Sequence, residues 1–159
     1  MFTDEEFMRE ALAEARMAAA DGEVPIGAVV VRDGVIVGRG HNTTETDRDP
    51  SCHAEMAAIR DACHNLGGWR LFGCDLYVTA EPCSMCAGVI VLARIRRLYI
   101  GTEDPKAGAC VSLYGITTDE RLNHQVELHV GLLKEECSAL LKDFFRRLRR
   151  KNTDQEVLK

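Results

Sequence analysis

The sequence predicts an α/β fold: a three-layer αβα arrangement in which a mixed central sheet of about five strands carries helices on both faces. Two observations support it. Short runs rich in β-branched residues alternate with segments of helical periodicity. One pair of such runs, Gly27–Val31 and Val35–Val37, flanks Asp33 and Gly34. This dipeptide is typical of β-hairpins because both residues tolerate the positive φ that the turn requires.

Capping signals and apolar periodicity indicate the first two helices. The capping box Thr3–Glu6 starts a helix that we expect to end near Gly22. A second helix is expected over residues 53–66, where Gly67 and Gly68 stop it. A polar loop, Asn42–Ser51, should precede this second helix.

The second half of the chain repeats the strand–helix pattern. Pro82 sits where a helix over residues 83–94 should begin, and the apolar character of this helix predicts that it is buried. A C-terminal helix is expected at about residues 131–150, with a basic tail. The remaining strands are expected at Leu76–Thr79, Arg97–Gly101 and Val126–Val130.

Size and composition bound the class of protein. A chain of 159 residues, 46% hydrophobic and 28% charged, predicts one domain over residues 1–159. The N-terminus is acidic where an export signal would be basic, and the apolar runs are too short to cross a bilayer, so we expect a cytoplasmic protein without membrane contact. Seven cysteines with only one closely spaced pair point to metal or redox chemistry.

The charge is unevenly distributed along the chain. The net charge of −5 argues against indiscriminate nucleic-acid binding. Residues 1–23 carry seven acidic and two basic side chains, whereas residues 140–151 carry six basic and one acidic. The basic cluster is either a solvated helix end or a local patch that contacts phosphates, and the charge count alone leaves both open.

Two short motifs carry the chemistry, and each opens a predicted helix. They are Cys52–Glu55 and Glu81–Cys86. Cys83 and Cys86 lie three residues apart, so one helix face presents both sulfurs, and a helix N-terminus favours their thiolate forms. With His53 they make three ligands, the number used by catalytic zinc sites, which leave the fourth position to water. We therefore expect one Zn²⁺ per subunit.

Glu55 follows the ligand His53 by two residues and should lie beside the metal without binding it. A carboxylate there can take a proton from water and deliver it to the substrate. Together the motifs form the H-x-E…P-C-x-x-C signature of zinc-dependent base deaminases. A redox pair would leave His53 and Glu55 without a role. A closed structural site would need Cys52 as a fourth ligand, but adjacent helical residues point about 100° apart.

Nearly the whole chain resembles the bacterial tRNA-specific adenosine deaminases of the cytidine deaminase-like superfamily. Residues 101–109, 122–127 and 144–146 carry the resemblance beyond the zinc motifs. It implies a hydrolase that converts the wobble adenosine of a tRNA anticodon loop, of an arginine tRNA, to inosine. It also implies a homodimer in which each tRNA anticodon stem-loop contacts both subunits.

The same resemblance implies a set of substrate-binding residues. Asn42 would contact the base, although without the family it would be read as a turn residue. The other residues of the set are Ala54, Asp104, Lys106, Asn123, Phe145 and Arg149.

Two alternatives stay open. A free nucleobase or nucleoside deaminase of salvage metabolism, acting on guanine, cytosine or cytidine, would not need the basic tail. A non-catalytic RNA-binding module stabilised by zinc would not need Glu55.

Overall fold

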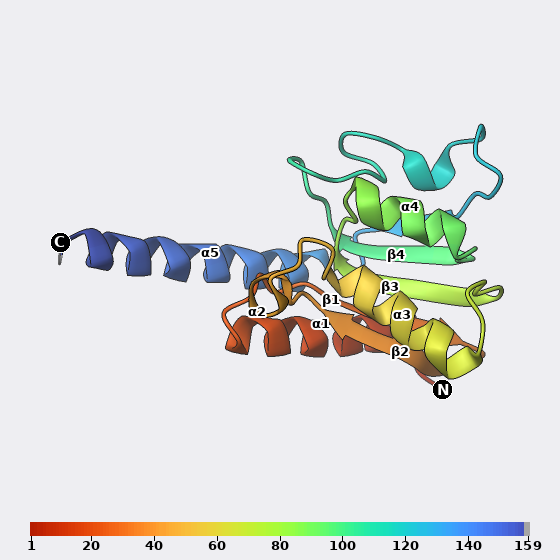
Figure 1. The fold of residues 1–159 in the computed structure, drawn as a ribbon, viewed down its shortest axis with the longest axis horizontal. Coiled ribbons are helices and arrows are strands. Elements are labelled where there is room, and N and C mark those ends of the chain that lie inside the picture. The colour runs from red at the N-terminus through yellow and green to blue at the C-terminus, as the bar shows by residue number, and fades with distance from the viewer. Residues whose placement is uncertain (158–159) are drawn as a thin grey trace.

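The computed structural model describes residues 1–157, and within them five strands form one mixed sheet (Figure 1). The strand order is β2-β1-β3-β4-β5. β1 runs antiparallel to both of its neighbours, while β3, β4 and β5 are parallel. The strands are β1 (Gly27–Arg32), β2 (Val35–His41), β3 (Cys74–Ala80), β4 (Arg97–Thr102) and β5 (Glu127–Val130).

Helices cover both faces of the sheet, which confirms the predicted three-layer fold. Along β1, Ala28 and Val30 face the core beneath α3 and α4, whereas Val29 and Val31 face the core beneath α1 and the start of α5. This alternation follows from the two-residue period of a strand. The helices are α1 (Asp4–Ala20), α2 (Thr44–Asp47), α3 (Ala54–Leu66), α4 (Ser84–Leu92) and α5 (Lys134–Val157), with a 3₁₀ turn, η1, at Ile116–Thr118.

Local signals in the sequence explain where several elements begin and end. Thr3 and Glu6 form the predicted capping box at the start of α1. Asp33 and Gly34 connect β1 to β2 with φ values of 51° and 76°, as the hairpin requires. Gly67 ends α3 in the left-handed region, with a φ of 74°.

The helix α4 differs from its prediction in two ways. It begins at Ser84 with Cys83 as its N-cap, so Pro82 lies before the helix and not in its first turn. It is also buried on one side only, since the exposed fraction is 37% for Met85 and 61% for Leu92. An apolar sequence therefore did not mean a fully buried helix.

The C-terminal helix is longer and more exposed than predicted. It spans Lys134–Val157 where the sequence indicated residues 131–150, and Cys137 is its one buried residue. Figure 1 shows the reason: α5 continues past the ends of the strands, away from the rest of the fold. Leu148, an apolar residue in the outer part of this helix, is exposed. The loop expected at 42–51 contains the short helix α2. None of the helices found in residues 1–157 is long and apolar enough to cross a membrane.

Candidate active site

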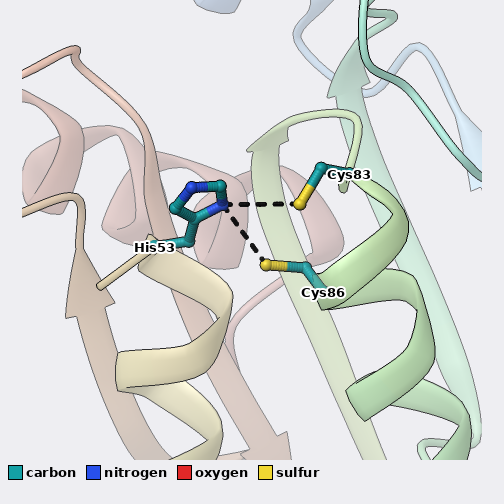
Figure 2. Close-up of side chains that lie close together, drawn as sticks. All are labelled: His53, Cys83 and Cys86. Carbon is teal, nitrogen blue, oxygen red and sulfur yellow. Dashed lines mark hydrogen bonds between the residues drawn. The ribbon is translucent and has the colours of Figure 1, made fainter. Parts of the chain in front are cut away.

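The starts of two helices bring the predicted zinc ligands together. His53 is the N-cap of α3, and Cys83 is the N-cap of α4. Cys86 follows in the first turn of α4 on the same face as Cys83. In Figure 2 the His53 ring from α3 points toward both sulfurs on α4. Within residues 1–157 these three side chains form the one cluster of His, Cys, Asp or Glu donors whose ligand atoms all lie within 4.8 Å of one another.

The spacing of the donor atoms fits zinc. Nδ1 of His53 lies 3.5 Å from Sγ of Cys83 and 3.5 Å from Sγ of Cys86. Zinc bonded to nitrogen and sulfur at its usual lengths and tetrahedral angles separates those two atoms by about 3.6 Å. The hydrogen bond from Cys86, followed by that from His53, outweighs burial and lowers the pKa of Cys83 to about 3. Cys83 therefore favours the thiolate form that binds metal.

Glu55 lies in the first turn of α3 and is buried, with an exposed fraction of 4%. It lines the same cavity as His53 and Cys83. Burial raises the pKa of Glu55 to about 6. A carboxyl group that titrates near neutrality can both accept and return a proton, which is compatible with the role predicted for Glu55.

A cavity of about 250 Å³ is lined by two of the three donors, His53 and Cys83. Oδ1 of Asn42 is buried and has no hydrogen-bond partner among residues 1–157, so it is free to accept a bond from a ligand. Two further predicted substrate residues, Ala54 and Asp104, line the same cavity. Its other walls come from Val24, Ile26, Thr44, Ala80, Glu81 and Ala107.

A larger groove of about 820 Å³ lies between α5 and the segment after β4. Asp104 lines both the cavity and the groove. Three other predicted substrate residues, Lys106, Phe145 and Arg149, line the groove. Two more basic side chains, Lys142 and Arg146, also face it. The C-terminal cluster of positive charge is therefore partly directed at the groove.

Asn123 is the one predicted substrate residue that the fold does not bring to either hollow. It is exposed in the segment between η1 and β5. Asn123 lines neither the cavity nor the groove.

Sequence reasoning missed a buried carboxylate that shapes the cavity. Glu23 accepts hydrogen bonds from the backbone N–H groups of Glu45 and Thr46 and from the Thr46 hydroxyl, at 2.7–3.0 Å. These bonds hold α2, whose residue Thr44 lines the cavity. The sequence feature that could have indicated Glu23 is its position directly before the apolar residues that lead into β1.

Comparisons with known proteins agree with the site. Residues 1–102 match the family described as the cytidine and deoxycytidylate deaminase zinc-binding region. The chain is 50% identical over 151 residues to the tRNA-specific adenosine deaminase of Bacillus subtilis, covering 95% of this chain and 94% of that protein. It is 46% identical over 145 residues to that of Aquifex aeolicus, covering 91% and 95%.

Solved structures of deaminases are also similar to this chain. One from a study of A-to-I editing by tRNA:A34 deaminases superposes with a TM-score of 0.82 at 49% identity, covering 85% of this chain and 98% of that chain. The guanine deaminase of Bacillus subtilis gives a TM-score of 0.61 at 40% identity, covering 64% and 66%. With its His-Cys-Cys zinc site and its similarity over most of its length, this chain belongs to the cytidine and deoxycytidylate deaminase zinc-binding family, among the tRNA-specific adenosine deaminases.

Proposed function

We propose that this protein hydrolyses the wobble adenosine of a tRNA anticodon loop, that of an arginine tRNA, to inosine. The observation that carries the proposal is that the small cavity at the zinc ligands adjoins the basic groove along α5, because Asp104 lines both. The cavity has room for one base, and the groove has room for the nucleotides beside it. A tRNA substrate also implies a cytoplasmic location.

The residues divide the reaction between them. His53, Cys83 and Cys86 would hold the zinc, which would supply a Lewis acid that makes water ionise near neutral pH. Glu55 takes a proton from the attacking water and passes it to N1 of adenine, and a second transfer moves the proton of the new C6 hydroxyl to the exocyclic amine. The C6–O bond forms, the C6–N bond breaks and ammonia leaves. Oδ1 of Asn42 accepts a hydrogen bond from the base and so orients it.

The basic groove explains how a protein with a net charge of −5 can bind a nucleic acid. A base inside a stack is out of reach of the cavity, so it must be extruded, and bases in a loop cost least to extrude. Phe145 is 40% exposed and can stack on a neighbouring base. Lys106 and Arg149 line the same groove and can neutralise the phosphates.

We also propose a homodimer formed through the exposed apolar side of α4. The surface consists of Met85 and Leu92 on α4 together with Val111, Leu113 and Tyr114 in the segment that follows. Figure 1 shows the chain between β4 and η1 lying over α4. A second copy of this chain is its occupant, because an RNA loop that contacts both subunits gives a role to Asn123, which lies apart from the cavity of its own subunit.

A free-base deaminase is the second candidate, favoured by the small cavity and by the similarity to a guanine deaminase. The deciding assay incubates the zinc-loaded protein with an arginine tRNA anticodon stem-loop that carries adenosine at the wobble position. Free adenine, guanine, cytosine and cytidine are tested in parallel. We expect inosine by sequencing of the stem-loop and little or no ammonia from the free compounds. Turnover of a free base with none of the stem-loop would contradict the proposal.

A further inference from the structure

Glu81 is a buried carboxylate that the reaction scheme above does not use. It directly follows β3 and precedes Pro82 and the ligand Cys83. Its exposed fraction is 4%. Its backbone N–H donates to the carbonyl of Thr102 on β4 at 2.8 Å, which fixes its place at the end of the sheet.

The carboxylate of Glu81 accepts hydrogen bonds from one segment that is distant in sequence, residues 104–112. Oε1 accepts from the N–H of Asp104 at 3.0 Å and from the hydroxyl of Ser112 at 2.5 Å. Oε2 accepts from the N–H groups of Cys110, Val111 and Ser112 at 3.1, 2.8 and 2.9 Å. Within residues 1–157 no Lys, Arg or His forms a salt bridge with it. Its charge is balanced by these donors alone.

The segment wraps tightly around this carboxylate. A Cβ on Gly108 would lie 2.3–2.4 Å from the carboxylate atoms of Glu81, closer than any real contact. The N–H of Ala109 also donates to the carbonyl of Pro82 at 2.9 Å. The wrapping therefore depends on a residue without a side chain at position 108 and on a full carboxylate at position 81.

The wrapped segment contributes Asp104 to the wall that the cavity and the groove share, beside Val24, Ile26 and Ala80. Asp104 lines both hollows, Ala107 lines the cavity, and Lys106 lines the groove. Oδ1 of Asp104 accepts from the N–H groups of Lys106 and Ala107 at 3.0 and 3.3 Å, so fixing Asp104 also fixes the next turn of chain. A displacement of the segment would move Asp104, Lys106 and Ala107, whereas none of the zinc ligands belongs to this segment.

We propose that Glu81 is a positioning residue for the substrate, because its carboxylate holds residues 104–112 as the wall that receives the extruded base and its neighbouring nucleotides. The inference rests on the proposed function for the identity of that substrate. Glu81 sets the affinity for the RNA and leaves proton transfer to Glu55.

The variant Glu81→Gln tests this role because it keeps the size of the side chain but leaves one carbonyl oxygen for five donors. We expect KM for the anticodon stem-loop to rise on the order of tenfold while kcat stays within about threefold. The reason is that a buried donor without an acceptor makes the position of residues 104–112 against residue 81 less stable, by a free energy that corresponds to a factor on the order of ten. Zinc should stay at one equivalent per chain. Amide hydrogen exchange in residues 104–112 should accelerate on the order of tenfold, with exchange in α3 unchanged.

Two further variants separate positioning from general loss of stability. Gly108→Ala keeps every charge but displaces the carboxylate, and it should reproduce the rise in KM. Glu127→Gln is the matched control, because this exposed carboxylate pairs with Arg97 on the sheet and touches neither hollow. It should keep the parental KM and the parental exchange in residues 104–112.

Three results would overturn the inference. They are loss of zinc in Glu81→Gln, an unchanged KM with a lowered melting temperature, and unchanged exchange in residues 104–112. The exchange measurement needs no substrate. Faster exchange in Glu81→Gln, in a protein whose parent is inactive on RNA, would support the positioning of residues 104–112 and contradict the proposed function alone.

Discussion

At the residue scale, the proposed chemistry depends on a carboxyl group, Glu55, that lies beside the metal ligands and is not one of them. Glu55 shares the cavity wall with His53 and Cys83, and burial places its pKa at about 6. Proton transfer of this kind contributes roughly 10²–10⁴-fold to a rate. The metal site and the proton carrier are therefore separable by mutation.

Glu55→Gln should lower kcat by at least ~10²-fold while one zinc per chain remains bound, because the amide cannot shuttle protons. Elemental analysis and the inosine assay measure the two properties on the same sample. Cys52→Ala is the matched control: it neighbours His53 but is not in the donor cluster, so zinc and activity should both persist. Appreciable turnover by a folded, zinc-loaded Glu55→Gln protein would refute this assignment.

Glu23→Gln should destabilise the protein by about 1–3 kcal/mol at pH 7, because the buried donors of α2 lose a charged acceptor. Although burial acts in the opposite direction, the hydrogen bonds from Thr46 and Glu45 lower the pKa of Glu23 below 4.5. The unfolded state then binds more protons in this range, so the stabilisation is fully present above pH 4.5 and is lost as the pH falls through the folded pKa.

Urea unfolding at pH 7 and again well below pH 4.5 tests this linkage. The difference between Glu23→Gln and the parent should shrink at the lower pH. Glu45→Gln removes the same charge from an exposed side chain nearby and should change little at either pH. An equal difference at both pH values would show that the charge of Glu23 does not matter.

At the scale of elements, α5 is the helix whose surroundings change most along its length. Its first turns pack on the sheet through Cys137, and its later turns extend beyond the sheet with exposed basic side chains (Figure 1). Arg146 and Arg149 line the groove. A helix with so little burial contributes little to the core, and this leaves its outer half available for a ligand.

Deleting residues 146–159 should weaken binding of the anticodon stem-loop and flatten its salt dependence. Each phosphate contact that is lost removes about 0.7 from the slope of log K against log salt for single strands. Zinc content should not change, because the donors lie on α3 and α4. Deleting residues 152–159 alone keeps the arginine cluster and serves as the control. A salt slope identical to that of the parent would show that the basic cluster makes no contact with RNA.

At the scale of the whole molecule, the exposed side of α4 is an apolar surface that the sequence predicted to be buried. Light scattering at micromolar concentration should report about twice 17.6 kDa for the protein. Leu92→Asp should shift the mass toward the monomer, because it places a charge within the proposed apolar contact. Val35→Asp changes an equally exposed residue on the outer strand β2 and should leave the dimer intact. A monomeric parent that still deaminates tRNA would refute the dimer.

The zinc site was predictable because its signals are local. His53, Cys83 and Cys86 each fall at a helix start that caps and turns reveal. The helices α3 and α4 follow β2 and β3, which run in the same direction on either side of β1, so both helices start at the same end of the sheet. The hairpin at Asp33 and the end of α3 at Gly67 were predictable for the same reason. Each depends on the conformations open to one or two residues.

By itself, the sequence determined the αβα class, the three zinc ligands, the position of Glu55 and the resemblance to tRNA adenosine deaminases. Only the tertiary structure decided which carboxylates brace the cavity, which side of α4 stays exposed and where α5 leaves the sheet. The partners of Glu23 and Glu81 lie more than twenty residues away along the chain. Periodicity and capping describe neighbours in sequence, whereas burial and long-range hydrogen bonds depend on how the whole chain packs.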